Sequence, residues 1–222
     1  MRSRLNHSLK LCLVTNITHQ PMEQYLRFVE EAVMGGVTMV QLREKSNNLV
    51  EVKTRARELQ RLLCSFEIPL IINDYVELAA EIDADGVHIG QQDMSITKAR
   101  GILGANKIIG LSIEDLDELS ESNNSNDIDY VTASAVFPSK TKPGCKQIWG
   151  IEGLQKITST SIHPVTAIGG IKLNNTLEII STGAKGIAVI GAIHDALNPY
   201  EAAQNLRKII DNKNGTALSY RR

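Results

Sequence analysis

Short apolar runs, rich in valine and isoleucine, recur along the chain and are separated by longer amphipathic stretches. Most of the runs are continuous rather than alternating in polarity. Continuous runs are typical of parallel strands that are covered by helices. The pattern predicts eight strands, at Leu9–Thr15, Val37–Leu42, Pro69–Asn73, Gly86–Gly90, Lys107–Leu111, Asp129–Ala133, Pro164–Ile168 and Gly186–Ile190.

The stretches between the runs carry apolar residues at helical spacing. One of them ends at Gly35-Gly36, a good C-terminal stop, and another begins at Ser95, an expected N-cap, and ends before Gly104. The pattern predicts helices at Met22–Met34, Leu49–Phe66, Tyr75–Glu81, Ser95–Leu103, Glu114–Leu119, Ile151–Ile157, Asn174–Ser181 and Tyr200–Asp211.

Eight strands, each followed by a helix, predict an α/β fold, the closed (β/α)8 or TIM barrel. The 222 residues suit a single domain that spans 1–222, although about 250 residues are typical of this fold. We expect frayed termini at about 1–8 and 212–222. An open, doubly wound sheet is the alternative. The chain lacks Gly-x-Gly-x-x-Gly after the first strand and lacks Gly-Lys-Ser/Thr, which argues against that alternative.

Charge and cysteine content narrow the choice of partners. The net charge is −1, and no segment forms a basic stripe, so we expect no nucleic-acid partner. The apolar stretch after the polar N-terminus, Leu11–Val14, is too short for a signal peptide or a membrane span. Three cysteines without CxxC spacing predict a reduced, cytoplasmic protein in which Cys12 and Cys64 pack as small apolar residues. The oligomeric state, monomer or homo-oligomer, stays open.

In a barrel of this kind the catalytic groups lie at the C-terminal ends of the strands. The second run ends in Gln41, Arg43 and Lys45 at alternate positions, so these three side chains point the same way. Arginine and lysine beside an amide suit a phosphate or pyrophosphate. The alternative is a solvated, charged loop.

Aspartates follow the third and fourth strands. Asp74 and Asp93 can face a single cation, because Mg²⁺ is usually held by one or two carboxylates together with substrate phosphates and water. Two unrelated loop aspartates are the alternative, and Asp93 also competes as a helix cap, because it lies shortly before Ser95.

Two further segments suit phosphate groups. The loop 137–144 contains Ser139, Thr141 and Lys142, whose hydroxyls and amine can cradle a phosphate, unless the loop is only a surface feature. Glycines after the seventh and eighth strands, at 169–170 and 191, mark the usual phosphate site of the barrel, unless they serve only tight turns. His88 and Trp149 are expected to be packing residues rather than catalytic ones.

Five motifs, in order along about 11–199, resemble those of the thiamine phosphate synthase family. The motifs are Gly36-Val-Thr-Met-Val-Gln-Leu-Arg-Glu-Lys45, Ile71-Ile-Asn-Asp74, Ala84-Asp-Gly-Val-His-Ile-Gly-Gln91, Phe137-Pro-Ser-Lys-Thr-Lys142 and Val165-Thr-Ala-Ile-Gly-Gly-Ile171. The resemblance implies a transferase of thiamine biosynthesis. Such an enzyme joins 4-amino-2-methyl-5-hydroxymethylpyrimidine diphosphate to a thiazole phosphate, or to its carboxy form, through a carbocation-like pyrimidine. Mg²⁺ assists, and pyrophosphate leaves.

The resemblance also implies roles for individual residues. The residues implied to bind the pyrimidine diphosphate are Gln41, Arg43, Lys45, Asn73, Ser112 and Lys142. Of these, the catalytic set is Arg43, Lys45, Ser112 and Lys142. The residues implied to bind the thiazole phosphate are Ser139, Thr141, Gly170, Ile190 and Gly191. Asp74 and Asp93 are implied as the Mg²⁺ ligands.

The chain departs from the family pattern at a few positions. Ser134-Ala135 stands where Gly-Pro is usual, Ser139 where threonine is usual, and Gly191 where serine is usual. The related thiazole tautomerase is an alternative, but it uses a histidine where this chain has Ala135. A non-catalytic barrel that binds phosphorylated ligands is a further alternative.

Overall fold

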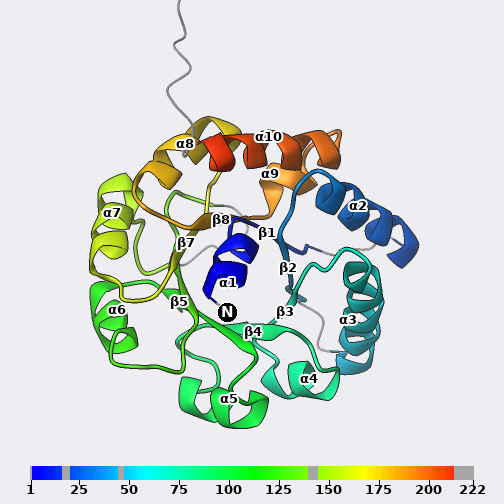
Figure 1. Cartoon of the computed structure of the whole chain (residues 1–222), viewed down its shortest axis with the longest axis horizontal. Helices are drawn as coiled ribbons and strands as arrows, with labels where there is room; N and C mark the ends of the chain where they lie inside the picture. Colours follow the sequence, from blue (N-terminus) through cyan, green and yellow to red (C-terminus); the bar gives the residue numbers. More distant parts are fainter. Residues whose placement is uncertain (1, 17–20, 45–47, 140–144, 213–222) are drawn as a thin grey trace, which may run out of the picture.

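A computed structural model of the chain describes residues 2–16, 21–44, 48–139 and 145–212. Eight parallel strands pair in chain order and β1 pairs with β8, so the sheet closes into a barrel (Figure 1). The strands are β1 (Leu11–Val14), β2 (Met39–Leu42), β3 (Leu70–Asn73), β4 (Gly86–Ile89), β5 (Ile108–Ile113), β6 (Tyr130–Ser134), β7 (Val165–Ile168) and β8 (Gly186–Val189).

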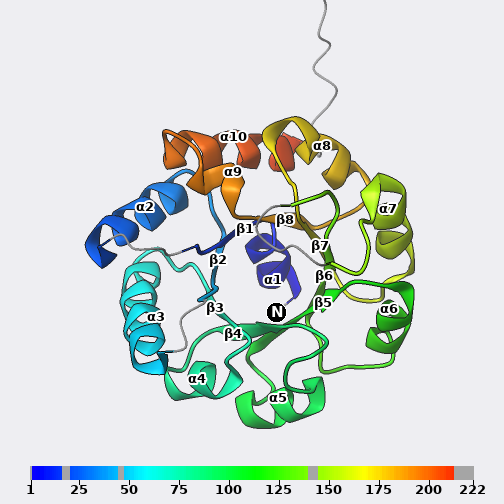
Figure 2. The ribbon, with the colours of Figure 1, turned by 180° about the vertical axis from the view of Figure 1, so that it is seen from behind.

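Helices surround the barrel on its outside (Figures 1 and 2). They are α2 (Met22–Met34), α3 (Leu49–Cys64), α4 (Val76–Glu81), α5 (Ile96–Leu103), α6 (Leu116–Ser122), α7 (Gly150–Thr160), α8 (Leu173–Ser181), α9 (Gly191–His194) and α10 (Pro199–Asn212). Their apolar faces pack on the outer faces of the strands and form one large core. The predictions of a (β/α)8 barrel and of a single domain are confirmed.

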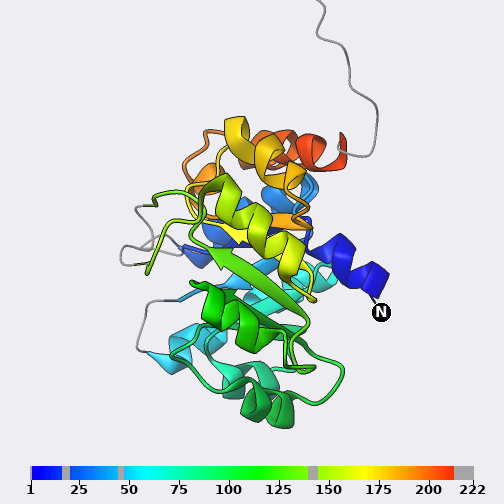
Figure 3. The same cartoon turned by 90° about the vertical axis from the view of Figure 1, so that its left-hand side faces the viewer.

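The N-terminus differs from the expectation that residues 1–8 are frayed. Arg2–Ser8 form helix α1, which lies across the end of the barrel where the strands begin (Figures 1 and 3). Leu5 of α1 packs against an interior cluster that contains Leu9, Cys12 and Tyr130. Covering these apolar side chains stabilises a helix too short to form alone. Fraying was also expected at the C-terminus, but the residues beyond Asn212 lie outside the described ranges.

Three smaller expectations are also corrected. Cys64 is exposed at the end of α3 rather than packed, whereas Cys12 is buried as predicted. Ser95 occupies the N-cap position of α5, but its side chain makes no capping hydrogen bond. The predicted set of helices lacks the short helix α9, because four residues are too few to show helical periodicity. Within the described ranges, no helix is long and apolar enough to cross a membrane.

Candidate active site

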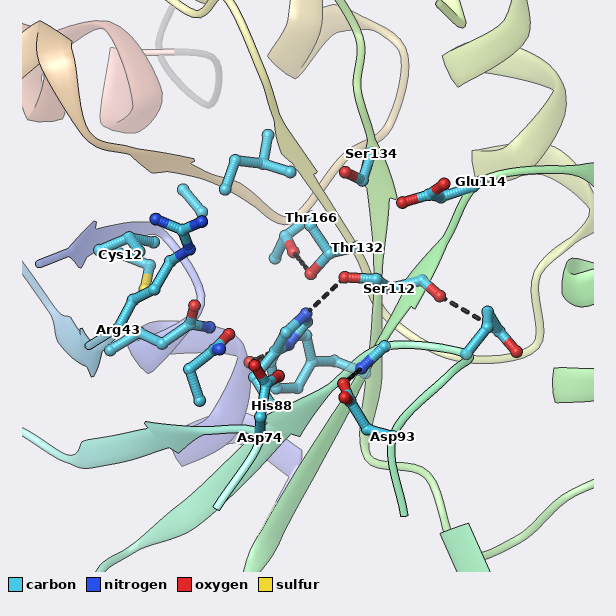
Figure 4. A pocket seen from close by; sticks show the side chains of 18 of the residues that line it. Cys12, Arg43, Asp74, His88, Asp93, Ser112, Glu114, Thr132, Ser134 and Thr166 are labelled. Atoms are coloured by element: carbon cyan, nitrogen blue, oxygen red, sulfur yellow. Dashed lines mark hydrogen bonds between the residues drawn. The ribbon is translucent and has the colours of Figure 1, made fainter. Parts of the chain in front are cut away.

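A cavity of about 360 Å³ opens at the C-terminal ends of the strands and extends into the barrel. All eight strands or the residues that follow them contribute to its wall. The interior cluster around Cys12 and Tyr130 forms its floor, above the end that α1 covers. Figure 4 shows this cavity with polar side chains around its mouth and hydroxyl groups on the far wall.

Two of the three residues predicted from alternation, Gln41 and Arg43, lie in this cavity. Gln41 is buried, and Arg43 comes directly after the end of β2 and points into the cavity (Figure 4). Asn73, the last residue of β3, lies in the same wall. These three residues bring one guanidinium and two amide side chains into one cavity, which is a suitable set for an anionic ligand.

Asp74 and Asp93 lie close together at the mouth, after the neighbouring strands β3 and β4 (Figure 4). Partial burial and the nearby Asp93 carboxylate raise the pKa of Asp74, and Arg43 opposes this effect. Asp74 is held in a left-handed conformation (φ 66°), and its amide donates a hydrogen bond to the His88 carbonyl at 3.0 Å. Two carboxylates this close repel each other when both are ionised, so the pair suits a cation.

Asp93 closes a turn rather than capping α5. Its Oδ2 accepts a hydrogen bond from the Gly90 amide at 2.7 Å, and the Asp93 amide donates to the Gly90 carbonyl at 3.3 Å. In the part of the chain that the structure describes, no three His, Cys, Asp or Glu residues are arranged to hold a metal. Asp74 and Asp93 thus offer two carboxylates, which fit Mg²⁺ if water and substrate oxygens complete its coordination.

A hydrogen-bonded histidine connects the floor of the cavity to its wall. His88 is buried, with Nδ1 3.0 Å from the Tyr130 hydroxyl and Nε2 2.9 Å from Ser112 Oγ. Burial also raises the pKa of the Tyr130 phenol well above its usual value. The expectation that His88 is a packed interior residue is confirmed, and its contact fixes the orientation of Ser112. Trp149 is buried in the outer core, as expected.

A second cavity, of about 660 Å³, lies beside the first at the ends of β6, β7 and β8. The two cavities share wall residues, among them Ser134, Ile168 and Ile190. Ser139, Gly170 and Gly191 line only the second cavity. The chain thus has two adjoining cavities with different polar groups, which is suitable for holding two ligands in contact.

The glycines of the second cavity are required by backbone geometry as well. Gly169 and Gly170 have φ values of 99° and 61°, and a Cβ at Gly169 would lie 2.4 Å from the Cβ of Ala135. Tight turns therefore explain this pair without a ligand. Gly191 differs, because its conformation is not left-handed, and a Cβ there would meet only the Asp195 carboxylate, at 2.6 Å.

The structure brings most of the predicted site residues together. Gln41, Arg43, Asn73, Asp74, Asp93 and Ser112 line the first cavity, Ser139, Gly170 and Gly191 line the second, and Ile190 lines both. Lys45, Thr141 and Lys142 lie outside the described residues.

Sequence reasoning missed the hydroxyl wall of Thr132, Ser134 and Thr166. The Thr132 and Thr166 hydroxyls lie 2.8 Å apart inside the barrel. The available signal was a serine or threonine at alternate positions of an otherwise apolar run, which places these hydroxyls on the inner face. It was missed because the runs were interpreted as wholly apolar.

Comparison with known proteins decides the family. A model of the family described as thiamine monophosphate synthase matches residues 11–193. The chain belongs to this family. It is therefore an enzyme of thiamine biosynthesis and a transferase, and the resemblance noted in its motifs is confirmed.

Relatives match over nearly the whole chain. The thiamine-phosphate synthase of Chlamydia caviae is 43% identical over 202 residues, covering 91% of this chain and 95% of the relative. That of Vibrio parahaemolyticus is 44% identical over 205 residues, covering 92% and 100%. The solved structure of thiamine phosphate pyrophosphorylase from Pyrococcus furiosus is 36% identical, covers 94% of this chain and 98% of that one, and superposes with a TM-score of 0.84.

Proposed function

We propose that the enzyme condenses 4-amino-2-methyl-5-hydroxymethylpyrimidine diphosphate with a thiazole phosphate, to give thiamine phosphate and pyrophosphate. The observation that carries the proposal is the pair of adjoining cavities. One is lined by Arg43 and the carboxylates of Asp74 and Asp93, and the other by Ser139, Gly170 and Gly191. A family whose members are named for thiamine phosphate synthesis supports this choice of substrates.

In this proposal the first cavity takes the pyrimidine diphosphate. Gln41, Asn73 and Ser112 bind the pyrimidine and its diphosphate, and Arg43 and Lys45 bind the diphosphate with Lys142. Mg²⁺, held by Asp74 and Asp93, would add positive charge beside the diphosphate. The donor set fits this ion, because both groups are oxygen ligands and their mutual repulsion is relieved by a cation.

The second cavity takes the thiazole phosphate. Ser139, Thr141, Gly170, Ile190 and Gly191 form the phosphate cradle, in which Gly191 offers a backbone amide where relatives of this family usually add a serine hydroxyl. The wall shared through Ser134 and Ile190 would let the thiazole nitrogen approach the pyrimidine methylene.

The chemistry needs no nucleophile from the protein. The amino group of the pyrimidine donates electron density into the ring, so the exocyclic C–O bond can ionise and the bonding electrons leave with the pyrophosphate. Arg43, Lys45 and Lys142 stabilise the charge that develops on this leaving group. The thiazole nitrogen then donates its electron pair to the methylene cation and forms the new C–N bond.

The test is a product assay on the purified protein with both substrates and Mg²⁺. Thiamine phosphate and pyrophosphate should appear in equal amounts by mass spectrometry, and neither should form when the thiazole phosphate is omitted. Arg43→Ala is the matched inactive control, since losing one charge-stabilising group typically costs about 2.7–4 kcal/mol of barrier. Absence of product from the wild-type protein would contradict the proposal.

A further inference from the structure

Thr15 lies at the point where β1 leaves the barrel. It follows Val14, the last residue of β1, and its amide donates to the Gln41 carbonyl at 2.8 Å, which extends the pairing with β2 by one step. The side chain is fully buried. Thr15 does not line either of the two cavities described above.

The Thr15 hydroxyl bonds to both backbone polar groups of Arg43. Its Oγ1 accepts a hydrogen bond from the Arg43 amide at 2.9 Å and donates one to the Arg43 carbonyl at 3.3 Å. A hydroxyl can do both, because it has one donor hydrogen and two acceptor lone pairs. The side chain of Thr15 thus replaces the backbone partner that β1 would have supplied had the strand continued.

We infer that Thr15 is a positioning residue for Arg43. The residue after a strand end has no sheet partner of its own on that side, so its backbone direction depends on such a contact. The guanidinium lies at the end of a long side chain, so a small rotation of the Arg43 backbone displaces it far from its place in the cavity. Fixing the amide and the carbonyl together prevents that rotation.

A buried phenol binds the residue that follows Thr15. Tyr25 is fully buried in α2, and its hydroxyl accepts a hydrogen bond from the Asn16 amide at 3.3 Å. The turn at Thr15 and Asn16 is therefore fixed to α2 while the Thr15 hydroxyl holds Arg43.

The experiment compares variants of Thr15 that separate the hydroxyl from the methyl group. Thr15→Ser keeps the hydroxyl, Thr15→Val keeps the shape, and Thr15→Ala loses both. Thr38→Val is the control, because Thr38 is also buried, accepts from the Leu11 amide at 2.9 Å and donates to the Ser8 carbonyl at 2.9 Å, but lies at the opposite end of the barrel.

The readouts are the Kd for inorganic pyrophosphate, from titration calorimetry, and the KM values for both substrates. We expect Thr15→Val and Thr15→Ala to raise the pyrophosphate Kd and the pyrimidine diphosphate KM by about fivefold or more, as for a lost buried hydrogen bond. Thr15→Ser should stay near wild type, the thiazole phosphate KM should not move, and Thr38→Val should change only the Tm.

The inference rests on the proposed role of Arg43, and the two can fail separately. Unchanged pyrophosphate affinity in Thr15→Val and Thr15→Ala, or in Thr15→Ala alone if the valine variant does not fold, overturns the positioning role. So does an equal loss in Thr15→Ser. A wild-type protein that binds pyrophosphate but forms no thiamine phosphate contradicts the proposed function, while the comparison of Thr15 variants still decides the inference.

Discussion

At the scale of single residues, the two facing carboxylates offer the sharpest test of a metal role. We predict that Asp74→Asn and Asp93→Asn each need much more Mg²⁺ for half-maximal activity, because a neutral amide loses the charge that binds the ion. An asparagine at 93 can still accept the Gly90 amide, so the turn should survive. At 74 the change removes repulsion between carboxylates, so the Tm without ligands should not fall.

The measurement is activity against Mg²⁺ concentration, with the Tm of each variant as its control. The Kd for thiazole phosphate alone should hardly change, because the second cavity contains neither aspartate. If one variant keeps the Mg²⁺ dependence of the wild type, that aspartate is not a ligand.

A second residue-scale prediction concerns Asp195, whose carboxylate lies in the second cavity beside Gly191. A negative charge beside a phosphate site repels the phosphate dianion, and the side chain is exposed, so solvent weakens the effect. We predict that Asp195→Asn lowers the thiazole phosphate KM about two- to fivefold. The pyrimidine diphosphate KM should not change.

The control is Asp117→Asn, which removes a charge of the same sign at an exposed residue that lines neither cavity. An equal fall in KM in that variant would show that only net charge matters. Gly191→Ser should be tolerated only if Asp195 turns away, since the new Cβ would lie 2.6 Å from its Oδ2.

How much of the site the sequence could predict depends on the kind of signal. Gln41 and Arg43 could be placed in one cavity from alternation alone, because strand geometry fixes which side chains share a face. The bond between Thr15 and Arg43 could not, since it joins residues 28 positions apart through the register of β1 and β2. Register depends on the closed barrel, which local sequence does not encode.

At the scale of elements, His194 links the short helix α9 to α2. Its ring stacks on Phe28 with the centroids 4.6 Å apart, and its Nε2 lies 3.4 Å from the Tyr25 hydroxyl. Burial lowers the pKa of His194 below its usual 6.5, although the Val14 carbonyl and the nearby Asp195 charge oppose this effect. The folded protein therefore keeps His194 neutral at a pH where the unfolded chain already binds a proton.

The pH dependence of stability follows from this direction. A folded-state pKa below the unfolded value means that the unfolded state binds more protons, so stability falls as the pH drops through about 6.5 toward the folded pKa. We predict that the His194→Gln variant has a lower Tm than the wild type at about pH 8 and above, where the histidine is neutral in both states. On acidification the variant should lose less stability than the wild type, because it lacks this titrating group.

The wild type and the His194→Gln variant must be compared with each other, because other groups titrate in the same pH range. The raised pKa of Asp74 has the opposite sign, and it contributes equally to both proteins. Thermal unfolding at several pH values measures the difference. Parallel curves for wild type and variant would mean that His194 carries no such linkage.

The elements that carry an apolar pattern were predictable, whereas helices α1 and α9 were not. Strands such as β7 and helices such as α2 match their predicted ranges closely, because apolar runs and helical periodicity report burial directly. Helix α1 carries few apolar residues, and its stability comes from covering the barrel end, which only the tertiary structure creates.

At the scale of the whole molecule, the residues that stabilise the barrel and the residues of the candidate site lie at opposite ends of it. Helix α1 and the interior cluster close one end, while both cavities open at the other. Closure itself could be predicted from eight strand–helix repeats, since such repeats leave an open sheet with two exposed edges unless the first and last strands pair. The division of the open end into two cavities depends on loop positions that periodicity does not report.

The last prediction uses that division. If the cavities hold different substrates, damage to each should affect one substrate only. Arg43→Ala should weaken pyrophosphate binding and raise the pyrimidine diphosphate KM, since it removes the guanidinium from the first cavity. Gly191→Leu should abolish thiazole phosphate binding, since its side chain would extend into the second cavity, where even a Cβ reaches within 2.6 Å of Asp195. Binding of each ligand alone, by calorimetry, separates the two effects from turnover. A Gly191→Leu variant with an unchanged thiazole phosphate Kd would remove the second cavity from the proposal, and a loss of both ligands in either variant, at an unchanged Tm, would show that the two cavities act as one site.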